Sequence, residues 1–184
     1  MKMKVMISWS GPCAKMVGVI LRDFLPRIVQ ALDPWMSEID LESGQRWQQE
    51  VGQQLNDHHI GISVITRQNV KAPWLNFEAG AISKSVKHSR VIPLLFDLKP
   101  SDVIGPIMQF QARMNSKEDV RLMLRDLNEL LDEDALVQSH LDDTFERFWP
   151  SMERKFEEVR NSPVSGMADP APSRSDREIG RAHV

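Results

Sequence analysis

Short runs of apolar residues divide the chain at intervals, and they indicate β-strands. The runs are rich in Val and Ile, which is typical of buried strands, and they cover residues 4–8, 60–66, 90–98 and 110–114. Residues 31–36 are a weaker candidate, because Pro34 lacks a backbone donor and suits only an edge strand. The pattern therefore predicts a five-stranded sheet with residues 31–36 at one edge.

Between these runs, apolar residues recur at spacings of three and four, which is the period of an amphipathic helix. This spacing predicts helices over residues 14–28, 45–57, 74–86, 120–131 and 144–159. Strands that alternate with helices indicate an α/β fold, with a parallel sheet and helices on both faces. Ligands of such sheets bind beyond the carboxyl ends of the strands. The search for a site therefore narrows to the loops at residues 8–11, 36–47, 66–78 and 96–106.

The composition is that of a globular domain without a strong charge. The 184 residues are 41% hydrophobic and 27% charged, and 23 Lys and Arg against 26 Asp and Glu leave a net charge of −3. This balance argues against nucleic-acid binding by bulk charge, and no apolar run is long enough to span a membrane. Cys13 is the single cysteine, and no signal-peptide pattern is found, so we expect a cytoplasmic protein. The few Cys and His residues argue against a structural zinc site, and we expect no metal.

The candidate loops carry none of the common nucleotide or hydrolase motifs. The first loop, SWSGP at residues 8–12, is neither a P-loop nor GxGxxG, and no GxSxG elbow is present. A receiver domain that accepts phosphate needs an acidic cluster after the first strand. This chain has Ser-Trp-Ser there, so a receiver function is set aside. The acidic residues Asp33, Glu38, Asp40 and Glu42 are interpreted as a solvated loop.

One carboxylate, Glu78, is suited by its position to stabilise a developing positive charge. It lies about one turn into the helix predicted after the strand at residues 60–66, where the helix N-terminus favours an ionised carboxylate. Trp74 is four residues earlier, so it shares the helix face of Glu78 and offers an aromatic wall. The alternative is that Glu78 only complements the helix dipole, and the spacing does not separate the two readings.

Several segments together resemble a known family. They are ISWSG at 7–11, PWMS at 34–37, IDLESG at 39–44 with Trp47 after it, Thr66, APWLNFEAGA at 72–81, the segment 105–111, and FWP at 148–150. In this order and spacing they resemble a bacterial Toll/interleukin-1 receptor (TIR) domain over residues 1–160. The resemblance implies a flavodoxin-like fold with a five-stranded parallel sheet, in agreement with the hydrophobic pattern.

The resemblance leaves two functions open. Many bacterial and plant TIR domains cleave NAD⁺ at the nicotinamide–ribose bond, whereas animal receptor members mostly bind other proteins. It therefore implies an NAD⁺ glycohydrolase or cyclase, an effector or signal generator in antiviral defence, and the alternative is a non-catalytic interaction module. In the enzyme Glu78 is catalytic, Trp74 binds substrate, and NAD⁺ is the substrate, with no cofactor.

The resemblance also implies further site residues and a partner. The family's first loop contacts the nucleotide, although a plain turn suits these positions equally, and here the loop residues are Ser8, Trp9 and Ser10. Residues 40–47 match the family's mobile loop, which gates the pocket and mediates TIR–TIR self-association. Gly44 suits a turn in that loop, and Trp47 is either a pocket wall or, as we favour, helix core.

Residues 161–184 are rich in Ser, Pro and charge without periodicity, which predicts a disordered tail after the domain. Residues 179–184 resemble a translated sequencing adapter, so we hypothesise an artefact there and a sensor domain in the natural frame. Arg67 and Asn69 are interpreted as solvated loop residues, with contacts to phosphates as the alternative. Trp149 is expected to pack a terminal helix, and Cys13 is expected to be either a small buried residue or a residue at a helix start.

Overall fold

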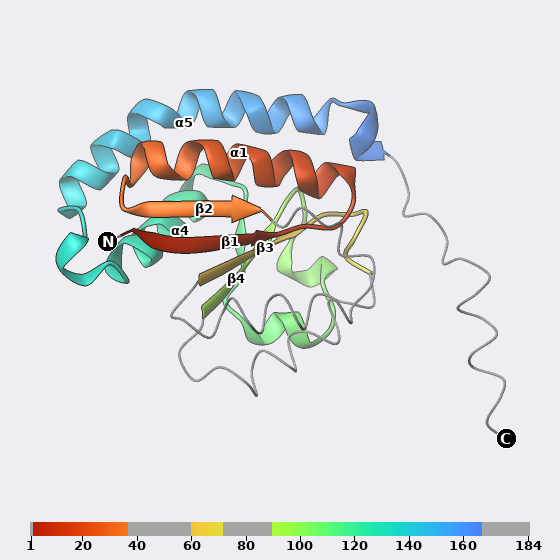
Figure 1. The fold of residues 1–184 in the computed structure, drawn as a ribbon. Coiled ribbons are helices and arrows are strands. Elements are labelled where there is room, and N and C mark those ends of the chain that lie inside the picture. Colours follow the sequence, from red (N-terminus) through yellow and green to blue (C-terminus); the bar gives the residue numbers. More distant parts are fainter. Residues whose placement is uncertain (1, 37–59, 72–89, 167–184) are drawn as a thin grey trace, which may run out of the picture.

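The computed structural model describes residues 2–36, 60–71 and 90–166, and one parallel sheet runs through them (Figure 1). Its strands are β1 (Met3–Ser8), β2 (Leu32–Met36), β3 (Ile60–Ile65), β4 (Arg90–Leu95) and β5 (Arg113–Met114). Their order is β2-β1-β3-β4-β5, and every pair is parallel. This order is the flavodoxin-like one, and it confirms the predicted five-stranded parallel sheet.

The strands follow the apolar runs, but β4 ends earlier than predicted and β5 begins later. β3 is buried at all six positions, as expected for a central strand covered on both faces. β2 lies at the edge, which confirms the position expected from Pro34. β4 ends at Leu95 rather than at residue 98, because Asp97 adopts a positive φ of 52°, which a strand cannot continue through.

The fifth strand is shorter than predicted. A 3₁₀ helix, Pro106–Gln109, occupies the approach to it, and the amide of Phe110 donates to the carbonyl of Ile107 at 3.2 Å. Only Arg113 and Met114 then pair with β4. The predicted strand at residues 110–114 is therefore wrong in its first three residues.

Helix α1 (Pro12–Ile28) covers one face of the sheet. Pro12 at its first position is preorganised for a helix and loses no backbone bond there. The apolar stripe predicted from the spacing is buried, and it comprises Val17, Ile20, Leu21, Phe24, Leu25 and Ile28. Gly18 lies so close to the sheet that an added Cβ would stand 2.7 Å from Met36 Cε.

Helix α5 (Gln138–Arg160) packs beside α1 and completes this layer (Figure 1). The ring of Trp149 lies 5.6 Å from that of Phe145 and 6.3 Å from that of Phe156, and all three are buried. This confirms that Trp149 packs a terminal helix. Helix α5 begins six residues before the predicted start at residue 144.

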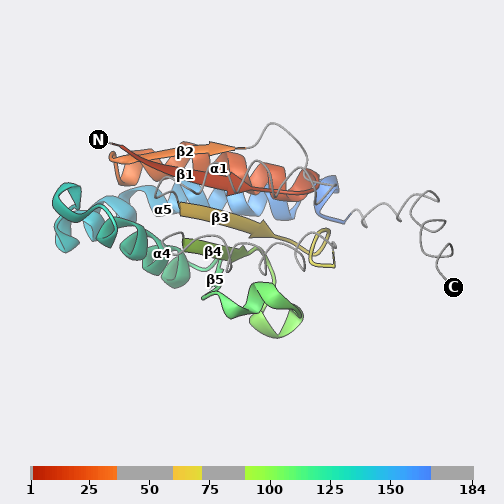
Figure 2. The same ribbon diagram turned by 60° about the horizontal axis from the view of Figure 1, so that its bottom comes forward.

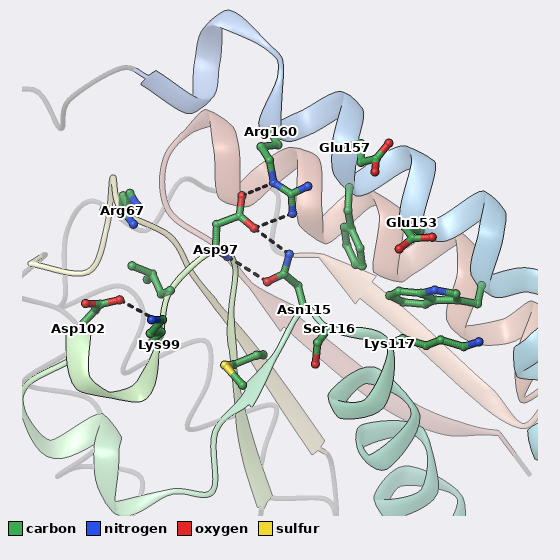
Figure 3. A pocket seen from close by; sticks show the side chains of 14 residues that line it. Arg67, Asp97, Lys99, Asp102, Asn115, Ser116, Lys117, Glu153, Glu157 and Arg160 are labelled. Atoms are coloured by element: carbon green, nitrogen blue, oxygen red, sulfur yellow. Dashed lines mark hydrogen bonds and ion pairs between the residues drawn. The ribbon is translucent and has the colours of Figure 1, made fainter.

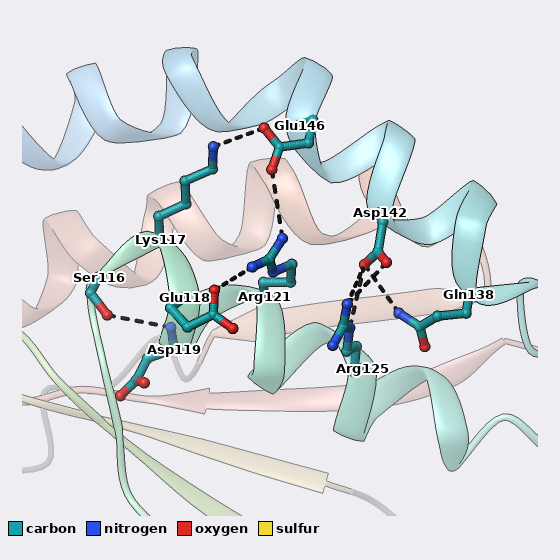
Figure 4. A network of polar contacts seen from close by, with 9 residues as sticks. All are labelled: Ser116, Lys117, Glu118, Asp119, Arg121, Arg125, Gln138, Asp142 and Glu146. Atoms are coloured by element: carbon teal, nitrogen blue, oxygen red, sulfur yellow. Dashed lines mark hydrogen bonds and ion pairs between the residues drawn. The ribbon is translucent and has the colours of Figure 1, made fainter.

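Helix α4 (Lys117–Glu129) lies against β5 and α5, and it begins three residues before the prediction. Ser116 caps it, since its side chain accepts a hydrogen bond from the amide of Asp119 at 3.3 Å. Ion pairs join α4 to the early part of α5 (Figure 4), with Arg125 to Asp142 at 2.9 Å and Lys117 to Glu146 at 2.8 Å.

The structure describes six residues after α5, from Asn161 to Gly166. A 3₁₀ helix, Pro163–Gly166, follows, and the hydroxyl of Ser165 donates to the carbonyl of Arg160 at 2.7 Å. The predicted tail therefore does not begin at residue 161, because hydrogen bonds hold the residues up to Gly166. The helices predicted at residues 45–57 and 74–86 lie outside the described residues. Within the described parts, no helix combines the length and apolarity needed to cross a membrane.

Candidate functional site

The carboxyl ends of the strands meet at one edge of the sheet, called the carboxyl edge below (Figure 2). After β1 the chain passes through α1 to β2, which lies on one side of β1 in the sheet. After β3 the later strands, β4 and β5, are added on the opposite side. The gap between β1 and β3 is therefore the switch point of the sheet, where open α/β folds bind their ligands. Two short segments flank it in the described structure, residues 8–11 and residues 66–71.

The first segment is buried. Ser8, Trp9 and Ser10 are 3%, 5% and 6% exposed. The hydroxyl of Ser8 donates to the carbonyl of Ile62 at 3.5 Å, a long contact, and Trp9 belongs to the main hydrophobic core. The ammonium of Lys15 lies 5.3 Å from the centroid of the Trp9 ring. These contacts give Trp9 a packing role, and the nucleotide-binding role of the three residues stays a prediction.

The second segment contains two buried amides that the sequence did not predict. Asn69 is 1% exposed and Gln68 is 6% exposed, so the interpretation of Asn69 as a solvated loop residue is wrong, whereas Arg67 is exposed as expected. The side chain of Gln68 accepts a hydrogen bond from the amide of Cys13 at 3.2 Å and donates to the carbonyl of Val164. It thereby links the start of α1 to the chain that follows α5.

Asn69 joins the two segments at the switch point. Its Nδ2 donates to the carbonyl of Ser10 at 3.1 Å and to that of Val64 at 3.0 Å, and its Oδ1 accepts from the amide of Thr66 at 2.8 Å. An Asn in a turn usually faces water, so residue type alone did not indicate this burial. Its position three residues after Thr66, at the end of an apolar strand, is the signal that was available.

Two hydroxyls at the carboxyl end of β3 have unmet hydrogen-bonding capacity. Ser63 Oγ and Thr66 Oγ1 are buried, and neither has a hydrogen-bond partner in the described part of the chain. A buried hydroxyl without a partner costs free energy, and such groups often mark places where a water or ligand completes the bonding. Both lie beside the switch point, at β3 and its following turn.

A cavity of about 490 Å³ lies further along the carboxyl edge, beyond β4 and β5 (Figure 3). Trp149 and Phe156 of α5 contribute aromatic surface to it, and charged side chains of both signs line it. None of the predicted site residues that the structure describes lines this cavity. Of its charged side chains, those of Asp97 and Arg160 pair with each other.

The best-defined polar cluster of this cavity surrounds Asp97. Its carboxylate accepts two hydrogen bonds from Arg160 and one from Asn115, and its backbone amide donates to Asn115 Oδ1 at 3.0 Å. The hydrogen bond from Arg160 is the largest cause that lowers the pKa of Asp97. The carboxylate is thus committed to structural contacts, and the sequence gave no sign of them because Arg160 is 63 residues away.

Some of the residues singled out in the sequence lie in the described ranges, and others lie outside them. Cys13 is buried at the start of α1, as expected, and burial is the main cause that raises its pKa to about 11. Within residues 2–36, 60–71 and 90–166, no group of three or more His, Cys, Asp or Glu is placed to hold a metal ion. The predicted residues outside these ranges are Gly44, Trp47, Trp74 and Glu78.

Comparison with protein families gives the chain an identity. A family model described as TIR domain matches residues 5–125, more than half of the chain. The match runs from within β1 into α4, so it includes all or most of each strand and both segments at the switch point. A search of curated proteins found no match. The sheet order and the family match together show that the chain belongs to the TIR domain family.

Proposed function

We propose that this TIR domain cleaves NAD⁺ at the nicotinamide–ribose bond. The products are nicotinamide and either ADP-ribose or a cyclic isomer of it. The TIR family includes members with this activity and members that only bind other proteins, so family membership alone does not choose between them. The choice rests on the carboxylate at Glu78.

The reaction asks little of the protein. Nicotinamide leaves as a neutral base and needs no acid, while the ribose acquires the positive charge of an oxocarbenium ion. An ionised carboxylate beside the ribose stabilises that charge, which is the role proposed for Glu78. Water then attacks the ribose carbon and loses a proton, which gives ADP-ribose, or a nucleophilic atom of the same molecule attacks and closes a ring.

The observation that carries the proposal is the place of Glu78 in the sequence after β3. Glu78 follows Ile65, the last residue of β3, by thirteen positions along a chain that leaves β3 at the switch point. Trp74 precedes it by four residues, so in a helix the two share one face. The unmet hydroxyls of Ser63 and Thr66 at the same end of β3 support a polar ligand at this place.

The remaining roles follow the family. Ser8, Trp9 and Ser10 form the first loop beside the switch point, and their buried positions suit a wall that holds the nucleotide in place more than a flexible contact. Gly44 and Trp47 belong to the loop proposed to gate the pocket. NAD⁺ is the substrate, no cofactor takes part, and the setting proposed is antiviral defence in the cytoplasm.

Self-association is proposed to control this activity. TIR domains commonly self-associate, and an enzyme that consumes NAD⁺ without control would harm its cell. Assembly that orders the residue 40–47 loop would make activity per molecule rise with protein concentration by mass action. A sensor domain or a partner protein would favour that assembly.

The test is to incubate the purified protein with NAD⁺ over a hundredfold range of concentration and to measure nicotinamide by chromatography. Glu78→Gln keeps the shape of the side chain and removes its charge. The matched control is Glu153→Gln, which makes the same change on α5 at the separate cavity beyond β4 and β5.

The proposal expects nicotinamide from the wild type and from Glu153→Gln, and none from folded Glu78→Gln. Full activity in folded Glu78→Gln would remove this residue from the mechanism. No nicotinamide from the wild type at any concentration would favour the alternative, an interaction module without catalysis.

A further inference from the structure

The amide of Asn69 is fully used in bonds to the backbone. Each of its two N–H groups donates to a carbonyl, those of Ser10 and Val64, and its oxygen accepts from the amide of Thr66. The distances, 2.8 to 3.1 Å, are those of well-formed hydrogen bonds. At 1% exposure no water competes for them, so the three bonds fix the side chain in one orientation.

Of these three bonds, the one to Ser10 connects different parts of the chain. Ser10 and Asn69 are 59 residues apart in the sequence, whereas Val64 and Thr66 belong to the same turn as Asn69. The paired register of β1 and β3 ends at Ser8 and Ser63. The Asn69 side chain therefore connects the two segments that follow β1 and β3, beyond the last paired residues of these strands.

This connection lies where the two chains separate. After Ser10 the chain enters α1, and after Asn69 it runs on toward Trp74 and Glu78. A buried amide with three backbone partners resists displacement, because moving either segment leaves at least one buried polar group unpaired. The Asn69 side chain thus holds the two segments together at Ser10, and Gln68 adds a second connection at the Cys13 amide.

We infer that Asn69 is a positioning residue for NAD⁺ cleavage. It holds the Ser8–Ser10 loop at a fixed place relative to the turn that leads to Glu78, and it contacts no substrate itself. This inference rests on the proposed function. Small displacements of a reacting group lower the rate of the chemical step strongly, while the contacts that bind the remote parts of a substrate are less affected.

Two variants separate the bonds of Asn69. Asn69→Asp keeps the size of the side chain and the acceptor for Thr66, but it removes both N–H donors. Asn69→Ala removes all three bonds. Should Asn69→Asp fail to fold, because it sets a carboxylate against two buried carbonyls, Asn69→Ala carries the comparison with Asn128→Ala.

Asn128 provides a matched control. It is a second buried Asn, 5% exposed, and its side chain also bonds to backbone on both sides: Nδ2 donates to the carbonyl of Leu136 at 2.8 Å, and Oδ1 accepts from the Leu136 amide at 2.8 Å. It lies near the end of α4, which starts at the carboxyl edge and runs away from it. Asn128→Ala therefore reports what losing a buried amide does to stability alone.

The experiment measures kcat and KM for NAD⁺ cleavage, well below the melting transition of each variant. It also measures hydrogen exchange of the peptide that contains Ser8 to Ala14. We expect kcat of Asn69→Asp to fall about 10- to 100-fold with KM changed less than about threefold, and exchange in that peptide to rise. Asn128→Ala should keep kcat within about twofold and leave that peptide unchanged.

The outcomes are distinguishable. If the wild type cleaves NAD⁺ and folded Asn69→Asp keeps a kcat within about twofold of the Asn128→Ala value, the positioning role is wrong and the proposed function stands. If the wild type releases no nicotinamide, the proposed function fails, and the positioning role fails with it. An equal loss of kcat in the Asn69 variant and in Asn128→Ala would also overturn the inference, because lower stability would then explain both losses.

Discussion

The guanidinium of Arg160 donates two hydrogen bonds of 2.8 Å to the carboxylate of Asp97 (Figure 3). Arg160 is the last residue of α5, and Asp97 follows β4 at a positive φ of 52°. Asn115 donates a further bond to the same carboxylate at 3.1 Å. The pair thus fastens the end of the last helix to the carboxyl edge of the sheet.

Removing the charge of Asp97 should lower stability in a pH-dependent way. The pKa of Asp97 is lowered in the folded protein, first by the Arg160 hydrogen bond. The contribution of the charge is therefore fully present above the ordinary pKa of 3.8, and it is lost as the pH falls through the lowered value. Because both side chains are partly exposed, we expect Asp97→Asn to cost about 1 kcal/mol near neutral pH.

Urea unfolding of Asp97→Asn and of the wild type, near neutral pH and again well below the ordinary pKa of the carboxyl, measures this. Asn tolerates positive φ, so the backbone adds little to the difference. The gap between the two proteins should narrow in acid. A gap that stays constant over the whole range would show that the Asp97 charge does not stabilise the fold.

A side chain at Gly11 should strain the first loop. Gly11 has φ of 82° and ψ of 162°, a conformation that other residues rarely adopt, and an added Cβ would stand 3.3 Å from Gln68 Oε1. We expect Gly11→Ala to lower the free energy of unfolding by about 1–3 kcal/mol. Gly61→Ala in β3 is the control, since an added Cβ there would meet its neighbours only at 3.8 and 3.9 Å.

Gly61→Ala should be close to neutral in the same urea titration, because no positive φ and no close approach opposes it. If the two variants lose the same stability, backbone strain at Gly11 is not the cause.

The thiol of Cys13 should be unreactive in the folded protein. Burial, and to a smaller extent the negative charge of Asp97, raises its pKa to about 11. The reactive thiolate is therefore scarce at neutral pH. We expect an aromatic disulfide reagent to label Cys13 at least about 100-fold more slowly in the native protein than in urea. Rapid stoichiometric labelling without denaturant would contradict the burial of this thiol.

Replacing Trp149 by Ala should mainly lower stability, whereas replacing Trp74 by Ala should mainly weaken NAD⁺ binding. Trp149 is buried between Phe145 and Phe156, so Trp149→Ala should cost about 3–5 kcal/mol of stability and leave the KM for NAD⁺ of the folded fraction unchanged. Trp74→Ala should weaken NAD⁺ binding with a smaller shift in melting temperature. Thermal melting and KM measured on both variants decide this, and equal losses in both would make Trp74 structural.

The sheet was largely predictable because β1, β3 and β4 are mostly apolar runs. β3 and β4 lie in the middle of the sheet, so burial leaves no polar face to blur the pattern. Pro34 even indicated the edge position of β2. The early part of α5 was missed because residues 138–143 contain a single buried apolar residue, Leu141, and long-range pairs such as Arg125 with Asp142 hold it instead.

The polar contacts of the carboxyl edge were not predictable in the same way. Asn69 bonds to Ser10 and Gln68 to Val164, across 59 and 96 residues of sequence. A local pattern shows that a turn follows β3, but it does not show which distant backbone groups need a partner. Glu78 and Trp74, in contrast, came from the family resemblance, and they remain predictions.

The two ends of the described chain lie at opposite edges of the sheet. β1 starts at Met3 on the amino edge, whereas Val164 is held at the carboxyl edge by Gln68 (Figure 1). Immobilising the protein on a biosensor chip through its N-terminus would therefore leave the carboxyl edge facing the solution. Attachment just after Gly166 would hold that edge close to the support and hinder the approach of a large analyte. The choice of anchoring point thus selects which side of the protein is presented for binding.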